Sequence, residues 1–188
     1  MSAANAIANR RGAVRFSPQR LASALVLALV LLTAGVVSAA PAENSPITPV
    51  AMITFDDDGK NLHYPSAIFF DTAEEELYLV NGGSSRIIVY GPDSFPRVSI
   101  GRGRGVEAPR GVFVTQKGEV YVCQSRSALT PNPRITVLNG AFFVEREITL
   151  DGIPETANFS PSKLAVSSDG LIYVAGESSR GVLVLDSE

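Results

Sequence analysis

The sequence repeats one pattern three times, and this repetition restricts the fold of the chain more than any other feature. In each copy a proline begins an extended apolar run, a second run centred on tyrosine follows a turn, and a third run follows a polar loop. The prolines are Pro65, Pro109 and Pro161, which lie 44 and 52 residues apart. The larger spacing comes mainly from extra residues in loops, above all in 125–133, where an insertion disturbs strand pairing least. Repeats of this length indicate supersecondary units that stack on one another.

The runs within each copy have the composition of short β-strands. We expect strands at 65–71, 77–80, 86–90 and 97–100 in the first copy, at 109–115, 120–123, 134–138 and 146–150 in the second, and at 161–167, 172–175 and 182–185 in the third. No segment after residue 40 has the apolar spacing of a helix. Four strands in each unit of this length are typical of propeller blades.

We therefore predict an all-β fold, a partial β-propeller of about three four-stranded antiparallel blades, preceded by an N-terminal hydrophobic signal helix. The blades span 51–106, 107–158 and 159–188, the last being incomplete, and residues 52–55 are expected to form an outer strand. Each terminal blade would present an apolar face. Either a longer, six-bladed protein or a homodimer that pairs three blades with three would cover these faces. Five positions recur for structural reasons, namely Tyr78, Tyr121, Tyr173, Arg86 and Arg134.

The repeat resembles that of the NHL propeller proteins. The motifs that carry the resemblance are the glycines at 101, 103 and 105 and the segments 109–114, 118–122 and 134–137, together with 78–81 and 86–89 of the first copy. The resemblance covers about residues 50–188 and implies a propeller fold, while it says little about function. Where the family usually has Asp after the second strand, this chain has Asn81, Gln124 and Gly176.

The first 39 residues have the pattern of an export signal. Four arginines without an acidic residue precede the apolar run 21–37, and Val37-Ser38-Ala39 ends it with small residues suited to signal peptidase. We expect a signal peptide at 1–39, a linker at 40–50, and an exported protein in the periplasm or outside the cell. The alternative is a membrane anchor that is not cleaved, since 17 apolar residues are the lower limit for a bilayer span.

Charge and composition exclude several classes of function. The part after residue 39 holds all 19 acidic residues against 12 basic ones, which argues against nucleic acid and against an anionic membrane surface. One Cys and one His supply neither a disulfide framework nor a tetrahedral zinc site, so we predict no metal and no cofactor. We expect His63 to have no catalytic role and Cys123 to be a small buried residue.

Candidate binding residues lie where the repeats differ from one another. The loops after the second strands gather at one rim of a propeller, so we predict ligand contacts at Asn81, Gln124, Arg126 and Glu177, with the inserted loop 125–133 as specificity element. The polar segments 84–86, 132–134 and 178–180 recur in these loops and are interpreted as structural braces. Residues 56–59 are interpreted as a solvated hairpin turn rather than a calcium loop, because three consecutive Asp side chains cannot converge. Residues 101–105 are interpreted as a glycine turn rather than an anion cradle.

These observations favour recognition over catalysis. We expect an exported propeller segment that binds a protein or small-molecule partner through its loop rim. One alternative is a lactonase- or lyase-like enzyme with a metal on the propeller axis, which would need carboxylate or amide groups from several blades. The other is a gene fragment without independent function.

Overall fold

The computed structural model describes residues 47–150, 158–177 and 181–186, and the chain from Pro49 onward forms one compact unit. The predicted leader, most of the linker and the segment 178–180 lie outside the described residues. Within the described ranges no helix has the length and apolar character that a bilayer crossing requires.

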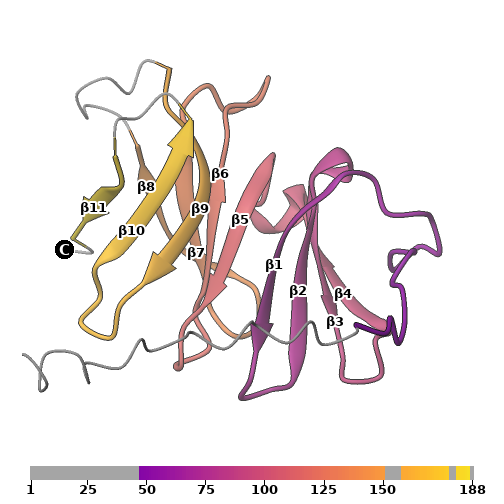
Figure 1. The fold of residues 1–188 in the computed structure, drawn as a ribbon. Coiled ribbons are helices and arrows are strands. Elements are labelled where there is room, and N and C mark those ends of the chain that lie inside the picture. Colours follow the sequence, from indigo (N-terminus) through magenta and orange to yellow (C-terminus); the bar gives the residue numbers. More distant parts are fainter. Residues whose placement is uncertain (1–46, 151–157, 178–180, 187–188) are drawn as a thin grey trace, which may run out of the picture. The chain divides into compact units, whose positions relative to one another are not determined.

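Three antiparallel sheets make up the described part of the chain (Figure 1). The first contains β1 (Pro65–Asp71), β2 (Glu76–Asn81), β3 (Arg86–Tyr90) and β4 (Pro96–Ile100), and the second contains β5 (Pro109–Val114), β6 (Val120–Gln124), β7 (Arg134–Leu138) and β8 (Val144–Thr149). The third contains β9 (Ser160–Val166), β10 (Ile172–Glu177) and β11 (Leu183–Leu185). The 3-10 turns η1 (Gly82–Ser84) and η2 (Arg102–Arg104) lie in loops. The fold is a partial β-propeller, as predicted, and each sheet is one blade.

The third blade has three strands within the described residues, as expected. One detail differs from the expected strands. Residues 52–55 do not form a strand, because Phe55 makes only an isolated bridge to Asn61 and no neighbouring strand offers its edge to this segment. Within each blade the strands follow one another as a regular meander. Tight turns at Gly118 and Gly170 join the first two strands of the second and third blades, with φ of +79° and +91° that glycine adopts without strain.

Two apolar layers hold the blades together. Between the first and second blades lie Tyr78, Ile87, Val112, Leu138 and their neighbours, and the rings of Phe69 and Phe113 meet with centroids 5.0 Å apart. Between the second and third blades lie Tyr121, Cys123, Ile135, Val137, Leu150, Phe159, Ile172 and Val174. The prediction that Cys123 is buried is confirmed, and burial raises the pKa of its thiol to about 12. In the second blade β5, β6 and β7 contribute alternate residues to the two layers, as a sheet packed on both faces requires.

The outer face of the first blade is partly covered by the segment that precedes it. Ile53 and Leu62 pack against Leu79, Ile88 and Tyr90, and the Tyr90 hydroxyl donates to the Phe55 carbonyl at 2.8 Å. This burial raises the pKa of Tyr90 to about 12. The remainder of the face is open.

The first strands β1, β5 and β9 lie side by side on the inner side of the stack (Figure 1). Lys163 of β9 reaches past the second blade, and its Nζ donates to the Ser66 carbonyl of β1 at 2.9 Å. The first and third blades are therefore joined directly, across 97 positions of sequence.

Candidate functional site

Two of the predicted binding residues, Asn81 and Gln124, are fully buried and brace the starts of their blades. Asn81 Oδ1 accepts a hydrogen bond from the His63 N–H at 2.7 Å, and Gln124 Oε1 accepts one from the Glu107 N–H. His63 and Glu107 both stand two residues before the proline that begins a blade. The amide after each second strand thus fixes the chain that enters the first strand, and the backbone N–H groups there are paired.

The third repeat replaces this amide brace with a ring. Gly176 stands at the position of Asn81 and Gln124, and a Cβ there would lie 2.4 Å from the Ser160 carbonyl and 2.7 Å from the Phe159 ring. Phe159 is two residues before Pro161 and is buried. Glycine is therefore required by the close approach of Phe159, and no side chain is left to bind a ligand at this position.

The recurring arginines have different surroundings in the first two blades. Arg134 is 6% exposed, with Nη2 at 3.1 Å from Gln124 Oε1 and Nε at 3.4 Å from Glu147 Oε1. Arg86 takes the same place in the first blade, but the strand register puts Ser99 where the second blade has Glu147. The shorter Ser99 side chain does not reach the guanidinium as Glu147 does, and space is left beside Arg86.

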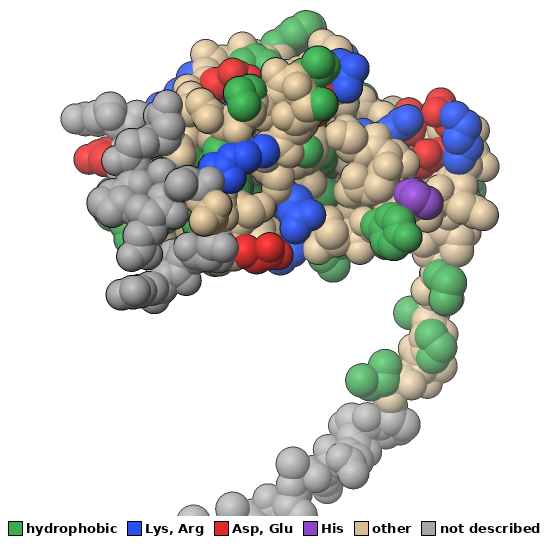
Figure 2. All heavy atoms as spheres, turned by 90° about the horizontal axis from the view of Figure 1, so that it is seen from above, with side chains coloured by type: hydrophobic (Ala, Val, Ile, Leu, Met, Phe, Trp, Pro, Cys, Tyr) green, Lys and Arg blue, Asp and Glu red, His purple; other side chains and the backbone are tan. Residues whose placement is uncertain are grey.

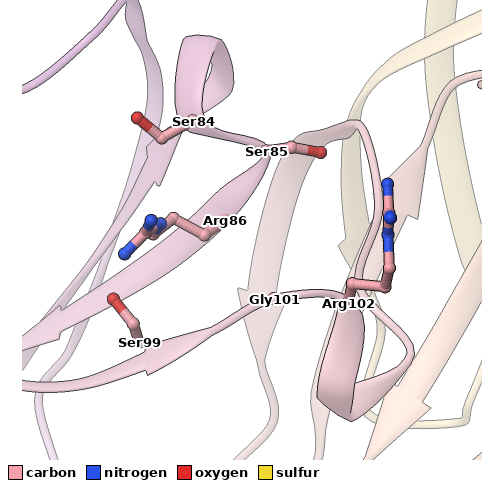
Figure 3. A pocket seen from close by; sticks show the side chains of 6 residues that line it. All are labelled: Ser84, Ser85, Arg86, Ser99, Gly101 and Arg102. Carbon is pink, nitrogen blue, oxygen red and sulfur yellow. The ribbon is translucent and has the colours of Figure 1, made fainter.

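This space is a hollow of about 390 Å³ at the rim of the first blade, lined by Ser84, Ser85, Arg86, Ser99, Gly101 and Arg102. Figure 3 shows Arg86 and Ser99 on one side and Arg102 on the other, with the two guanidinium groups directed apart. Ser85 Oγ is occupied, because it accepts the Ala108 N–H at 2.7 Å. The hollow therefore offers arginine and serine groups from separate walls.

The acidic hairpin at 56–59 closes the hollow on the side of Arg86. Asp57 Oδ1 and Asp58 Oδ2 lie 3.5 and 3.4 Å from Arg86 Nη1, and the Ser99 hydroxyl donates to Asp57. The hydrogen bond and positive charge of Lys60, and then the hydrogen bond from Arg86, hold the pKa of Asp58 below its usual value. The predicted turn is confirmed, but it is not wholly solvated. Asp56 is 2% exposed, and its carboxylate accepts the N–H groups of Asp58 and Lys60, which leaves the next two carboxylates to face Arg86.

Glu107 joins the other wall of the hollow to the inserted loop 125–133. Its Oε1 lies 2.8 Å from Arg102 Nη2, and its Oε2 accepts the Thr130 hydroxyl at 3.3 Å. Hydrogen bonding from Ser127 and then the charge of Arg102 hold the pKa of Glu107 below its usual value. The loop tip is tightened by the Ser127 hydroxyl, which accepts the Thr130 N–H at 3.0 Å. The insertion is thus anchored next to the hollow.

The other predicted residues lie apart from this hollow. Arg126 is exposed on the inserted loop, and Glu177 ends β10 with a carboxylate 3.7 Å from Arg110 Nη2. The ring of His63 packs edge-on against Tyr64. Asn81, Gln124, Arg126 and Glu177 therefore do not form one cluster, and a binding role for them stays a prediction. Residues 101–105 do form the expected turn, with Gly105 at φ +73°, while Gly101 and Arg102 also line the hollow.

Sequence reasoning missed Ser99, Asp57 and Asp58 as members of the site. The signal lies in the strand register, because Ser99 pairs with Ile88 as Glu147 pairs with Thr136 at the equivalent position of the second blade. Figure 2 looks onto this rim and shows acidic and basic side chains intermingled rather than gathered in patches of one sign. In the part of the chain that the structure describes, no three His, Cys, Asp or Glu side chains are grouped so that they could hold a metal ion.

Comparison with solved structures places the fold among propeller proteins. Kuenenia stuttgartiensis hydrazine synthase matches 76% of this chain with a TM-score of 0.51 and 17% identity, and a streptogramin B lyase matches 71% with a TM-score of 0.50 and 13% identity. The chain spans 36% and 43% of the length of those two proteins. No known protein family and no curated protein matches the chain by sequence. At this level of identity the similarity concerns the propeller fold alone.

Proposed function

We propose that this chain is an exported propeller segment of the NHL type whose rim hollow binds a small polar ligand that carries a carboxylate or phosphate group. The observation that supports this proposal is the replacement of Glu147 by Ser99 at the equivalent position of the first blade. In the second blade a carboxylate of the chain itself occupies the space beside the repeat arginine. In the first blade Asp57 and Asp58 pair with Arg86 from the preceding hairpin instead, and the space that Glu147 fills in the second blade is left as the hollow. An external oxyanion in that hollow can bind Arg102 and the N–H groups of Arg86 that these carboxylates do not contact.

The charges around the hollow suit a ligand of this kind. Arg102 is 73% exposed and meets Glu107 through Nη2, so other N–H groups of its guanidinium face solvent. Asp57 and Asp58 orient Arg86 and offset part of its charge, which favours a ligand that also presents hydroxyl or amine groups. The anchored loop 125–133 adds an exposed apolar side chain, Leu129, near the same rim.

The test fills the hollow with the residue that the second blade uses. The full chain is titrated with inorganic phosphate and, separately, with acetate at constant ionic strength, and the arginine Nε–H signals are followed by NMR. The signals of Arg86 and Arg102 are expected to shift in the native chain and to stay unchanged in Ser99→Glu. Ser168→Glu, on an exposed hairpin of the third blade, is the matched control and should respond as the native chain does. Equal responses from native chain and Ser99→Glu would refute the proposal.

Export and the NHL assignment rest on the sequence pattern. The basic and apolar segments before Ala39 support cleavage and release, and the glycine and tyrosine spacings of the repeats support the NHL type. When the full chain is expressed in a bacterial host, N-terminal sequencing of the exported product should begin at Ala40. Recovery of the intact chain in the membrane fraction would instead support the anchor.

A further inference from the structure

The third blade exposes a face that the other two blades cover. Tyr78 and Tyr121 occupy the same position in β2 and β6 and are 4% and 3% exposed, each covered by the following blade. The equivalent Tyr173 of β10 is 37% exposed, with Val182 and Val184 beside it at 57% and 56%. These three residues are called the β11 face. The β11 face has the same kinds of residues as the equivalent faces of the first and second blades, and each of those faces is covered by the next blade.

The first blade exposes the complementary half of the same interface. Val112 and Val114 of β5 are both 6% exposed because they pack on the first blade. Their equivalents in β1 are Ile68 and Phe70, which are 70% and 54% exposed. Ile68 and Phe70 are called the β1 face. A hollow of about 230 Å³ lies next to Phe70 and is lined by Ile53, Leu77 and Tyr90 among others.

The segment before the first blade stands where a fourth strand stands before the other blades. Leu62 is three residues before Pro65, as Val106 is before Pro109, and both pack on the blade that follows. Ile53 packs on the first blade as Val98 of β4 packs on the second. Residues 52–54 thus lie where the fourth strand of a preceding blade would lie, but the described structure has no third strand next to them for pairing. In the third blade, β11 has β10 as its only neighbour in the described sheet.

We propose that a second copy of this chain supplies both missing parts. The β11 face of one copy packs on the β1 face of the other, and residues 52–54 of the second copy pair with β11 of the first as an antiparallel fourth strand. Exchange of the two copies generates the same contact again, so that two chains close a ring of six blades. Figure 1 shows the β1 blade and the β11 blade at opposite sides of the stack, as this exchange requires.

A second copy fits better than an unrelated partner, because the proposed interface repeats the contact between neighbouring blades that the chain already makes twice. The layer between the first two blades and the layer between the last two join the same repeat positions. The β11 face and the β1 face are the two halves of a third such layer. A two-fold assembly buries both halves in both copies and pairs the edge of β11 that has no neighbour in the described sheet.

Mass in solution tests the assembly. Multi-angle light scattering of the full chain, in detergent if the leader is retained, is expected to give twice the mass of one chain. Val184→Arg and Phe70→Arg each place a charge on one of the two faces and are expected to give the mass of one chain with an unchanged circular dichroism spectrum. Leu129→Arg, on the exposed loop 125–133, is the matched control and should remain dimeric. A native chain with the mass of one copy overturns the proposal, as does a dimer that tolerates both variants.

A disulfide tests the strand exchange itself. If Ile53 takes the place of Val98, then Thr54 takes that of Ser99 and lies opposite Leu183, since Ser99 pairs with Ile88 in the first blade. Thr54→Cys with Leu183→Cys is expected to give a chain dimer on non-reducing gels that a reductant removes. The native thiol is buried and contributes little background. Thr48→Cys with Leu183→Cys is the control, and an equal yield from it would overturn the pairing.

Discussion

Gln124 is the side chain whose replacement distinguishes a structural brace from a ligand contact most directly. It is fully buried and bonds to four groups: its Oε1 accepts the Glu107 N–H and Arg134 Nη2, and its Nε2 donates to the Gly105 carbonyl and the Thr136 hydroxyl. Leu has nearly the same volume, so Gln124→Leu removes these bonds with little change in packing. The backbone N–H of Glu107 and the buried guanidinium of Arg134 would then lose a partner.

The expected loss of stability follows from these two groups. An unsatisfied buried backbone N–H costs about 1–3 kcal/mol, and a lost bond to a charged group costs about 1.5–3 kcal/mol. Because the terms are not additive, we expect Gln124→Leu to lower the free energy of unfolding by about 3 kcal/mol. Urea unfolding of the full chain, followed by circular dichroism, measures the difference. Gln116→Leu, at an exposed hairpin position, should change the value by less than about 0.5 kcal/mol.

A second variant separates the brace from a general packing effect. Gln124→Leu leaves the buried charge of Arg134 without its amide partner, and Arg134→Met removes that charge. The loss of unfolding free energy in the double variant should therefore be about 1–2 kcal/mol smaller than the sum of the losses in the two single variants. Strict additivity would contradict the network. A Gln124→Leu chain that unfolds within about 1 kcal/mol of the native chain would refute the assignment of Gln124 as a brace, and the amide would again be a candidate for ligand binding.

Three further changes test other parts of the structure. The thiol of Cys123 has a pKa of about 12 when folded against about 9 when unfolded, so its contribution to stability is complete below pH 9 and is lost as the pH rises towards 12. Between pH 8 and pH 10 this thiol should account for about 1.3 kcal/mol of lost stability in urea titrations, and Cys123→Ala should lack that part of the decline. Gly111→Ala places a Cβ 2.9 Å from the Ser162 carbonyl of the next blade and should destabilise the chain by about 1–3 kcal/mol in the same assay, whereas Gly103→Ala meets nothing within 4 Å and should be neutral. Asp56→Ala loses two hydrogen bonds in its turn and should lower the melting temperature measured by calorimetry, with a cost of about 1–2 kcal/mol, while an unchanged melting temperature would count against the turn.

The blades could be predicted from the sequence because turn residues and the alternation of apolar and polar residues determine where each strand begins and which face is buried. Each repeat carries the same markers, namely the prolines that begin β1 and β5, the tyrosines of β2 and β6 and the glycine turns. Apolar residues alternate along the strands, and this alternation places the tyrosines between two sheets. The failure at residues 52–55 has a different cause. Their apolar alternation is that of a strand, but a strand also needs an edge to pair with, and no neighbouring strand of the described structure offers one.

The candidate site was harder to predict, because it arises from a difference between repeats rather than from a motif. Asn81 and Gln124 differ from the usual family residue, yet both amides point inward and bond to the backbone. The consequential difference is at Ser99, on a fourth strand, where repeats diverge most in sequence. Only the strand register shows that Ser99 and Glu147 are equivalent and that both lie beside the repeat arginine.

The hydrogen bond from Lys163 to Ser66 bears on how the stack comes apart. In a linear array where each unit touches only its neighbours, terminal units fray first and independently. Here a strand of the last blade is tied to a strand of the first, so we expect loosening at one end to be felt at the other. Melting should therefore proceed as a single concerted event, and amide hydrogens in β1 and β9 should exchange with solvent at matching rates.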